Sequence, residues 1–114
     1  MFWQIPTSGT TRTLLLAAAL GIALPALAAG DPDVGRKKSQ PCKACHGEAG
    51  MSAAPDFPNL AGQNADYLAA VLKHYKNGRR KNAIMQGQVA NLSQKDIYDL
   101  AAYYASQKGL TIKY

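Results

Sequence analysis

Two cysteines and a histidine stand close together in the stretch "PCKACHGEAG" at residues 41–50. Cys42 and Cys45 are three residues apart, and His46 follows the second cysteine directly. Cysteines and a histidine at this spacing are found in zinc sites, in redox-active dithiol pairs and at points of covalent haem attachment. The rest of the chain has to distinguish these three chemistries.

The haem interpretation needs the fewest additional residues. Two thiols one helical turn apart can reach both vinyl groups of one porphyrin and form thioethers, and His46 then presents its imidazole to the iron. A structural zinc site needs four ligands, and His74 is the only other histidine. A thioredoxin-like dithiol expects a preceding strand, but no period-two alternation is present. The motif therefore predicts one haem c, attached through Cys42 and Cys45 and ligated by His46.

The second axial position of the iron is predicted to be filled by Met85. Electron-carrying haems often combine His with Met, which raises the reduction potential. Met51 lies only five residues after His46, too close to reach the opposite face of the ring. Met85 lies in the polar segment "RRKNAIMQGQ", where a methionine is poor core material. His74 is a weaker rival, because it borders the apolar face of a predicted helix.

Two strong helices are predicted to hold this site. The first covers residues 64–77, with Asn64 as its cap. The second covers residues 93–107, where Ser93 and Asp96 have the spacing of a capping box. Their apolar faces are expected to consist of Tyr67, Leu68, Val71, Leu72 and Tyr75, and of Ile97, Leu100, Ala101 and Tyr104.

A shorter helix is predicted from about residue 33 into the cysteine motif, disturbed by Pro41. Residues 47–63 and 79–91 are expected to form long loops, which in so small a domain suit the wrapping of a large cofactor. The predicted fold is all-α, with three main helices and long loops wrapped around one haem.

The first 28 residues have the layout of a secretory signal peptide. Arg12 precedes the apolar run of residues 14–24, Pro25 interrupts it, and an Ala-x-Ala cleavage site ends at Ala28. An uncleaved membrane anchor is the alternative, but the apolar run is short for a bilayer. We expect export to the periplasm and a cytochrome domain at residues 29–114.

The basic residues are unevenly distributed along the chain. The net charge is +6, and without Arg12 it is +5, from 12 basic and 7 acidic residues. No acid lies between Asp66 and Asp96. That interval contains Lys73, Lys76, Arg79, Arg80, Lys81 and Lys95. Such a basic face favours transient docking onto acidic redox proteins, a membrane-bound oxidase or reductase among them. Nucleic acid is not an expected partner of an exported chain.

Taken together, these segments resemble the class I c-type cytochromes. The sequence is similar to bacterial periplasmic cytochromes of the c553 type and to a single haem domain of the diheme cytochrome c4 group. The similar segments are "PCKACHG", "PDFPNLAGQ", "YLAAVLKHYKNGRRKNAIM" and "LSQKDIYDLAAYYASQ".

The resemblance implies roles for further residues. The backbone carbonyl of Pro58 would accept a hydrogen bond from the proximal imidazole, and Leu60 would pack on the haem. Gly35 would lie where the first and last helices cross, opposite Tyr103 or Tyr104.

The function implied is one-electron transfer by a monohaem carrier that is not an enzyme and has no small-molecule substrate. The alternative is a haem subunit bound permanently to a periplasmic oxidoreductase or a terminal oxidase. A gas sensor or peroxidase-like enzyme would need an open iron site, and a ligating Met85 would close it.

Overall fold

The computed structural model describes Trp3 and residues 30–109. These residues form α1 (Pro32–Lys38), α2 (Gln40–His46), the short 3-10 helix η1 (Glu48–Gly50), α3 (Ala65–Lys76), α4 (Ala83–Val89) and α5 (Gln94–Ser106). This described part contains no strand, and the predicted all-α class is confirmed. It also contains no helix long and apolar enough to cross a membrane. The predicted signal peptide, apart from Trp3, lies outside the described residues.

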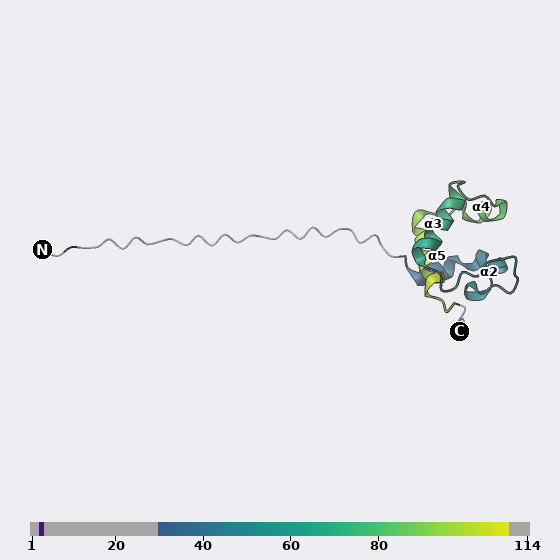
Figure 1. Cartoon of the computed structure of the whole chain (residues 1–114), viewed down its shortest axis with the longest axis horizontal. Coiled ribbons are helices and arrows are strands. Elements are labelled where there is room, and N and C mark those ends of the chain that lie inside the picture. The colour runs from purple at the N-terminus through teal and green to yellow at the C-terminus, as the bar shows by residue number, and fades with distance from the viewer. Residues whose placement is uncertain (1–2, 4–29, 110–114) are drawn as a thin grey trace.

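Helix α5 is the element against which α1 and α3 pack. Figure 1 shows α3 and α5 side by side, with α2 and α4 projecting to the same side near opposite ends of this pair. The predicted apolar face of α5 is buried. The core combines it with α3 and consists of Leu68, Ala69, Ile97, Leu100, Ala101, Tyr103 and Tyr104.

The helices predicted over residues 64–77 and 93–107 begin at their predicted caps. The Asn64 side chain accepts hydrogen bonds from the first backbone N–H groups of α3. Ser93 and Asp96 form the reciprocal capping box of α5. The predicted apolar face of α3 is wrong at Tyr67, whose side chain is 52% exposed, while its neighbour Leu68 is buried.

The helix predicted from residue 33 into the cysteine motif is two helices, α1 and α2, because the helix is interrupted at Ser39. Pro41 lies in the first turn of α2, where its missing N–H costs no intrahelical hydrogen bond, so it opens a helix instead of disturbing one. Ser39 is fully buried, and its hydroxyl donates to the Arg36 carbonyl at 2.8 Å.

The prediction of a loop over residues 79–91 is wrong, because most of this segment forms α4. Asn82 caps it by accepting a hydrogen bond from the Met85 backbone N–H at 3.0 Å. The helix packs against α3. Beyond its end, the Lys76 ammonium donates to the carbonyls of Ala90, at 3.0 Å, and Leu92. One lysine of α3 thus fixes the chain that leaves α4.

Helices α1 and α5 cross in direct backbone contact at Gly35. A Cβ atom at this position would lie 1.9 Å from the Asp99 carbonyl oxygen and 2.7 Å from Cβ of Tyr103. Only glycine allows this approach. Of the two tyrosines considered from the sequence, Tyr103 is the one opposite Gly35.

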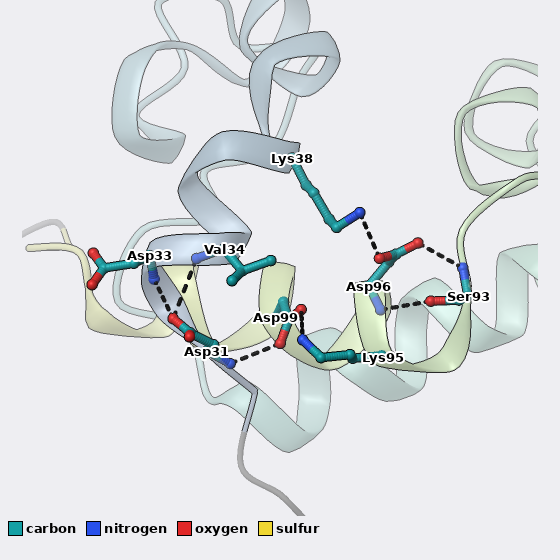
Figure 2. A network of polar contacts seen from close by, with 8 residues as sticks. All are labelled: Asp31, Asp33, Val34, Lys38, Ser93, Lys95, Asp96 and Asp99. Carbon is teal, nitrogen blue, oxygen red and sulfur yellow. Dashed lines mark hydrogen bonds and ion pairs between the residues drawn. The ribbon is translucent and has the colours of Figure 1, made fainter.

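Polar contacts, drawn in Figure 2, hold the two ends of α1 against α5. At the start of α1, the Asp31 N–H donates to the Asp99 carboxylate at 2.8 Å, and Lys95 pairs with the same group at 2.6 Å. At the end of α1, Lys38 pairs with Asp96 at 2.7 Å. Asp99 is only 1% exposed. Burial alone would raise its pKa, but Lys95 and the Asp31 amide keep the pKa below its ordinary value.

Candidate haem-binding site

The cysteine motif forms most of α2. Cys42 and Cys45 are both free and half-buried, and a spacing of three residues puts them on one side of the helix. Cys42 packs against the core, and this burial raises the pKa of its thiol, so the S–H stays protonated at neutral pH.

His46 is the last residue of α2 and is 7% exposed. Its Nδ1 lies 2.8 Å from the Pro58 carbonyl oxygen. Because a carbonyl oxygen can only accept, Nδ1 carries the proton of the neutral ring. Nε2 is then the nitrogen with a free lone pair, held in a fixed orientation, as a metal ligand requires.

Pro58 reaches His46 because the chain after η1 folds back on itself. The Gly50 carbonyl accepts a hydrogen bond from the Leu60 N–H at 2.8 Å. The Asn59 side chain accepts one from the Ser52 N–H at 2.7 Å. No role was predicted for Asn59, although it lies beside Pro58 in "PDFPNLAGQ". Its contribution is to fix the turn that presents the proline carbonyl.

The other residues considered for the haem site lie outside the cysteine motif. Leu60 is half-buried and packs against the core cluster; its contact with haem stays a prediction. Met51 follows η1 directly and is 37% exposed. Met85 lies in the first turn of α4 and is partly buried. Its role as an iron ligand stays a prediction.

His74, the rival ligand, lies in a different place. With Lys73 and Tyr98 it lines an open pocket of about 280 Å³ along α3 and α5. No residue of the cysteine motif and no methionine lines this pocket, so it is separate from the candidate site.

The side chains of the candidate site fit a haem c. They comprise two free thiols on one helix and an imidazole with Nε2 available. Elsewhere in the described chain, large apolar side chains are exposed, among them Phe57 at 37%, Tyr67 at 52% and Ile84 at 64%. For zinc, the described residues bring no three His, Cys, Asp or Glu side chains together.

Comparison with known proteins agrees with this donor set. Residues 36–103 match the family profile described as cytochrome C oxidase, cbb3-type, subunit III. The chain is 47% identical to cytochrome c-554(548) of Halomonas halodenitrificans over 83 residues, covering 70% of this chain and all of that protein. The chain belongs to the class I c-type cytochromes. The cofactor of this cytochrome is therefore covalently bound haem c.

A solved structure gives the same fold. Reduced recombinant cytochrome c4 from Pseudomonas stutzeri superposes with a TM-score of 0.69 at 44% identity, covering 72% of this cytochrome and 48% of that chain. The thiosulfate dehydrogenase electron acceptor of Thiomonas intermedia is 39% identical over 101 residues, which are 85% of this chain and 45% of that protein. This cytochrome thus spans about half the length of these two relatives.

Proposed function

We propose that this cytochrome is a monohaem carrier that moves one electron at a time between redox proteins. The observation that carries the proposal is the buried His46 imidazole, fixed by the Pro58 carbonyl, directly after two half-buried thiols on one helix.

Cys42 and Cys45 would hold the haem. Each cysteine would be joined to the haem by one thioether bond, in which its sulfur no longer carries a hydrogen. The bound haem supplies an iron that exchanges one electron between its ferric and ferrous states. His46 would ligate the iron through Nε2, and the hydrogen bond to Pro58 would keep that imidazole oriented and basic.

Met85 would provide a second iron ligand from α4. An iron held by two protein ligands would leave no site for a small-molecule substrate, which favours a carrier over an enzyme. Leu60 would pack against the ring, as an extension of the core cluster that it already joins.

The carrier would work in the periplasm. The first 28 residues would direct export, and the cytochrome domain would comprise residues 29–114. Attachment of haem to the two cysteines fits an exported protein, because their thiols would otherwise be exposed to an oxidising compartment.

Docking would be directed by two basic residues that follow α3. Three other cations of this region already have partners within the chain: Lys73 donates to the Tyr98 hydroxyl at 2.6 Å, Lys76 donates to two backbone carbonyls, and Arg80 stacks on Tyr75. Arg79 and Lys81 are exposed and have no side-chain partner among residues 30–109. These two cations, which lie in the segment between α3 and α4, would meet the acidic partner.

A second candidate function is that of a haem subunit held permanently by an oxidoreductase. The similarity to a thiosulfate dehydrogenase electron acceptor favours it, because that relative is named for accepting electrons from an enzyme. The two candidates differ in the lifetime of the complex between the cytochrome and its redox partner. Recovery of the cytochrome free of any partner from periplasmic extracts would therefore support the carrier.

The first experiment is an absorption spectrum of the exported protein, oxidised and reduced, followed by carbon monoxide. The carrier predicts a low-spin spectrum, a long-wavelength sulfur–iron band in the oxidised form and no response to carbon monoxide. Carbon monoxide binding to the reduced protein would show an open iron site, and the carrier proposal with Met85 as ligand would be abandoned.

A further inference from the structure

One buried polar atom lacks a partner. Tyr104 is 4% exposed, and its hydroxyl is the buried side-chain oxygen or nitrogen of the described residues that has no hydrogen bond. The neighbouring Tyr103 is equally buried, at 5%, and its ring lies 5.0 Å from that of Tyr104. A buried hydroxyl without a partner is destabilising, so such an atom in a packed core calls for an explanation.

The hydroxyl lies next to the first cysteine of the motif. Cys42 packs against the cluster that contains Tyr104, and the Cys42 thiol and the Ser39 hydroxyl are its polar neighbours. Burial, followed by the closeness of Cys42, raises the pKa of Tyr104, so the phenol keeps its proton. The ring cannot move away freely, because Gly50 approaches its edge so closely that a Cβ there would be 2.7 Å from Cδ1.

We propose that the Tyr104 hydroxyl donates a hydrogen bond to the Cys42 sulfur once this sulfur is in thioether linkage to the haem, and so positions that linkage. A thiol is both donor and acceptor, whereas a thioether sulfur has lost its hydrogen and can only accept. Tyr104 brings a donor to that sulfur from α5, an element distant in sequence from the motif. This inference rests on the proposed attachment of haem at Cys42.

Ser39 is the competing acceptor. Its own hydrogen is used on the Arg36 carbonyl, at 2.8 Å, but the lone pairs of its oxygen remain able to accept. A decisive experiment must therefore separate a hydrogen bond to sulfur from one to the serine oxygen.

The experiment compares Tyr104→Phe with the matched control Tyr103→Phe, both as haem-loaded protein. Denaturant titration is expected to show a roughly threefold to tenfold larger unfolding equilibrium constant for Tyr104→Phe and little change for the control. The carbon–sulfur stretching band in the resonance Raman spectrum is expected to shift in Tyr104→Phe alone. Both substitutions keep the aromatic ring, so a purely packing role would move neither reading.

Two results would overturn the inference. Equal or greater stability of Tyr104→Phe would mean that the hydroxyl stays unpartnered in the loaded protein. Lower stability with an unshifted carbon–sulfur band would assign the hydrogen bond to Ser39.

A double-mutant cycle with Cys42→Ala, in which haem is held by Cys45 alone, provides the second test. In that background Tyr104→Phe should no longer destabilise, and an undiminished effect would refute the contact. Mass spectrometry of the wild type separates this outcome from failure of the proposed function. A protein without two thioethers would refute the haem site itself, whereas two thioethers with an unshifted band would refute only the role of Tyr104.

Discussion

The atom that orients the His46 imidazole belongs to the backbone, at the Pro58 carbonyl. No side-chain replacement can delete it, so its position depends on the surrounding turn, which Asn59 and Gly50 hold through hydrogen bonds. At the scale of single residues, the chain thus separates two tasks. The motif on α2 supplies the reactive groups, and the turn after η1 sets the direction of one of them.

Met85 and Met51 should behave differently when replaced. Met85→Ala should remove the long-wavelength sulfur–iron band and allow the reduced protein to bind carbon monoxide, because the iron would lose its ligand from α4. Met51→Ala is the matched control and should leave both readings unchanged, since Met51 follows η1 on the side of the motif. Carbon monoxide binding by Met51→Ala, and not by Met85→Ala, would mean that Met51 is the iron ligand and Met85 is not.

Among the elements, those with complete end signals were predictable from the sequence. Asn64 and the Ser93–Asp96 capping box place the starts of α3 and α5, because caps act through contacts within a few residues. Helix α4 was missed because its apolar residues are few and Gly87 interrupts them. It is stabilised by packing on α3, which a local pattern does not contain.

Tertiary contacts also explain the other differences. Asp99 reads as a surface residue, yet the crossing of α1 buries it and provides the Asp31 amide as its partner. The proximity of His46 to Pro58, 12 residues away, was available only through the family resemblance. Spacing alone could give the reactive residues, but it could not give the turn that joins them.

Replacement by alanine should have opposite effects on stability at two helical glycines, Gly35 at the crossing of α1 and α5 and Gly87 in α4. Gly35→Ala should lower the free energy of unfolding by about 2 kcal/mol or more, because the new methyl group would meet the α5 backbone 1.9 Å away. Gly87→Ala should raise it by up to about 1 kcal/mol, because nothing lies within 4 Å and alanine favours the helix. Denaturant titration of the loaded protein measures both, and destabilisation of equal size would contradict the crossing geometry.

The ion pair between α1 and α5 predicts acid sensitivity. Hydrogen bonding from Lys38 lowers the pKa of Asp96 to about 2 from 3.8. Because the pKa of Asp96 is lower in the folded than in the unfolded chain, the stabilisation by this ion pair is complete above about pH 4 and is lost as the pH falls toward 2. Asp96→Asn should lower stability at neutral pH by about 1 kcal/mol and flatten the decline in this window.

The control for that pH dependence is Glu48→Gln. Glu48 pairs with Lys43 at 2.7 Å, but its side chain is 79% exposed, so solvent screens the pair. An equal change in the pH profile of both variants would show that Asp96 has no special role.

For the molecule as a whole, the proposed docking surface predicts salt-dependent electron transfer. The rate with an acidic partner should fall as ionic strength rises, because screening shortens the range of attraction. The double variant Arg79→Glu/Lys81→Glu should react about tenfold more slowly at low salt. Lys37→Glu/Lys108→Glu changes the net charge equally and should have a smaller effect; equal losses would assign the effect to net charge alone.

The attachment of α4 has a consequence for motion. This helix packs on α3, most of its residues are exposed, and the Lys76 ammonium secures the chain beyond it. Its opening should therefore require less free energy than global unfolding, and its backbone amides should exchange with deuterium well before those of α5. If Met85 ligates the iron, each such opening would release the ligand, so the exchange rate of α4 would limit how fast an external ligand enters.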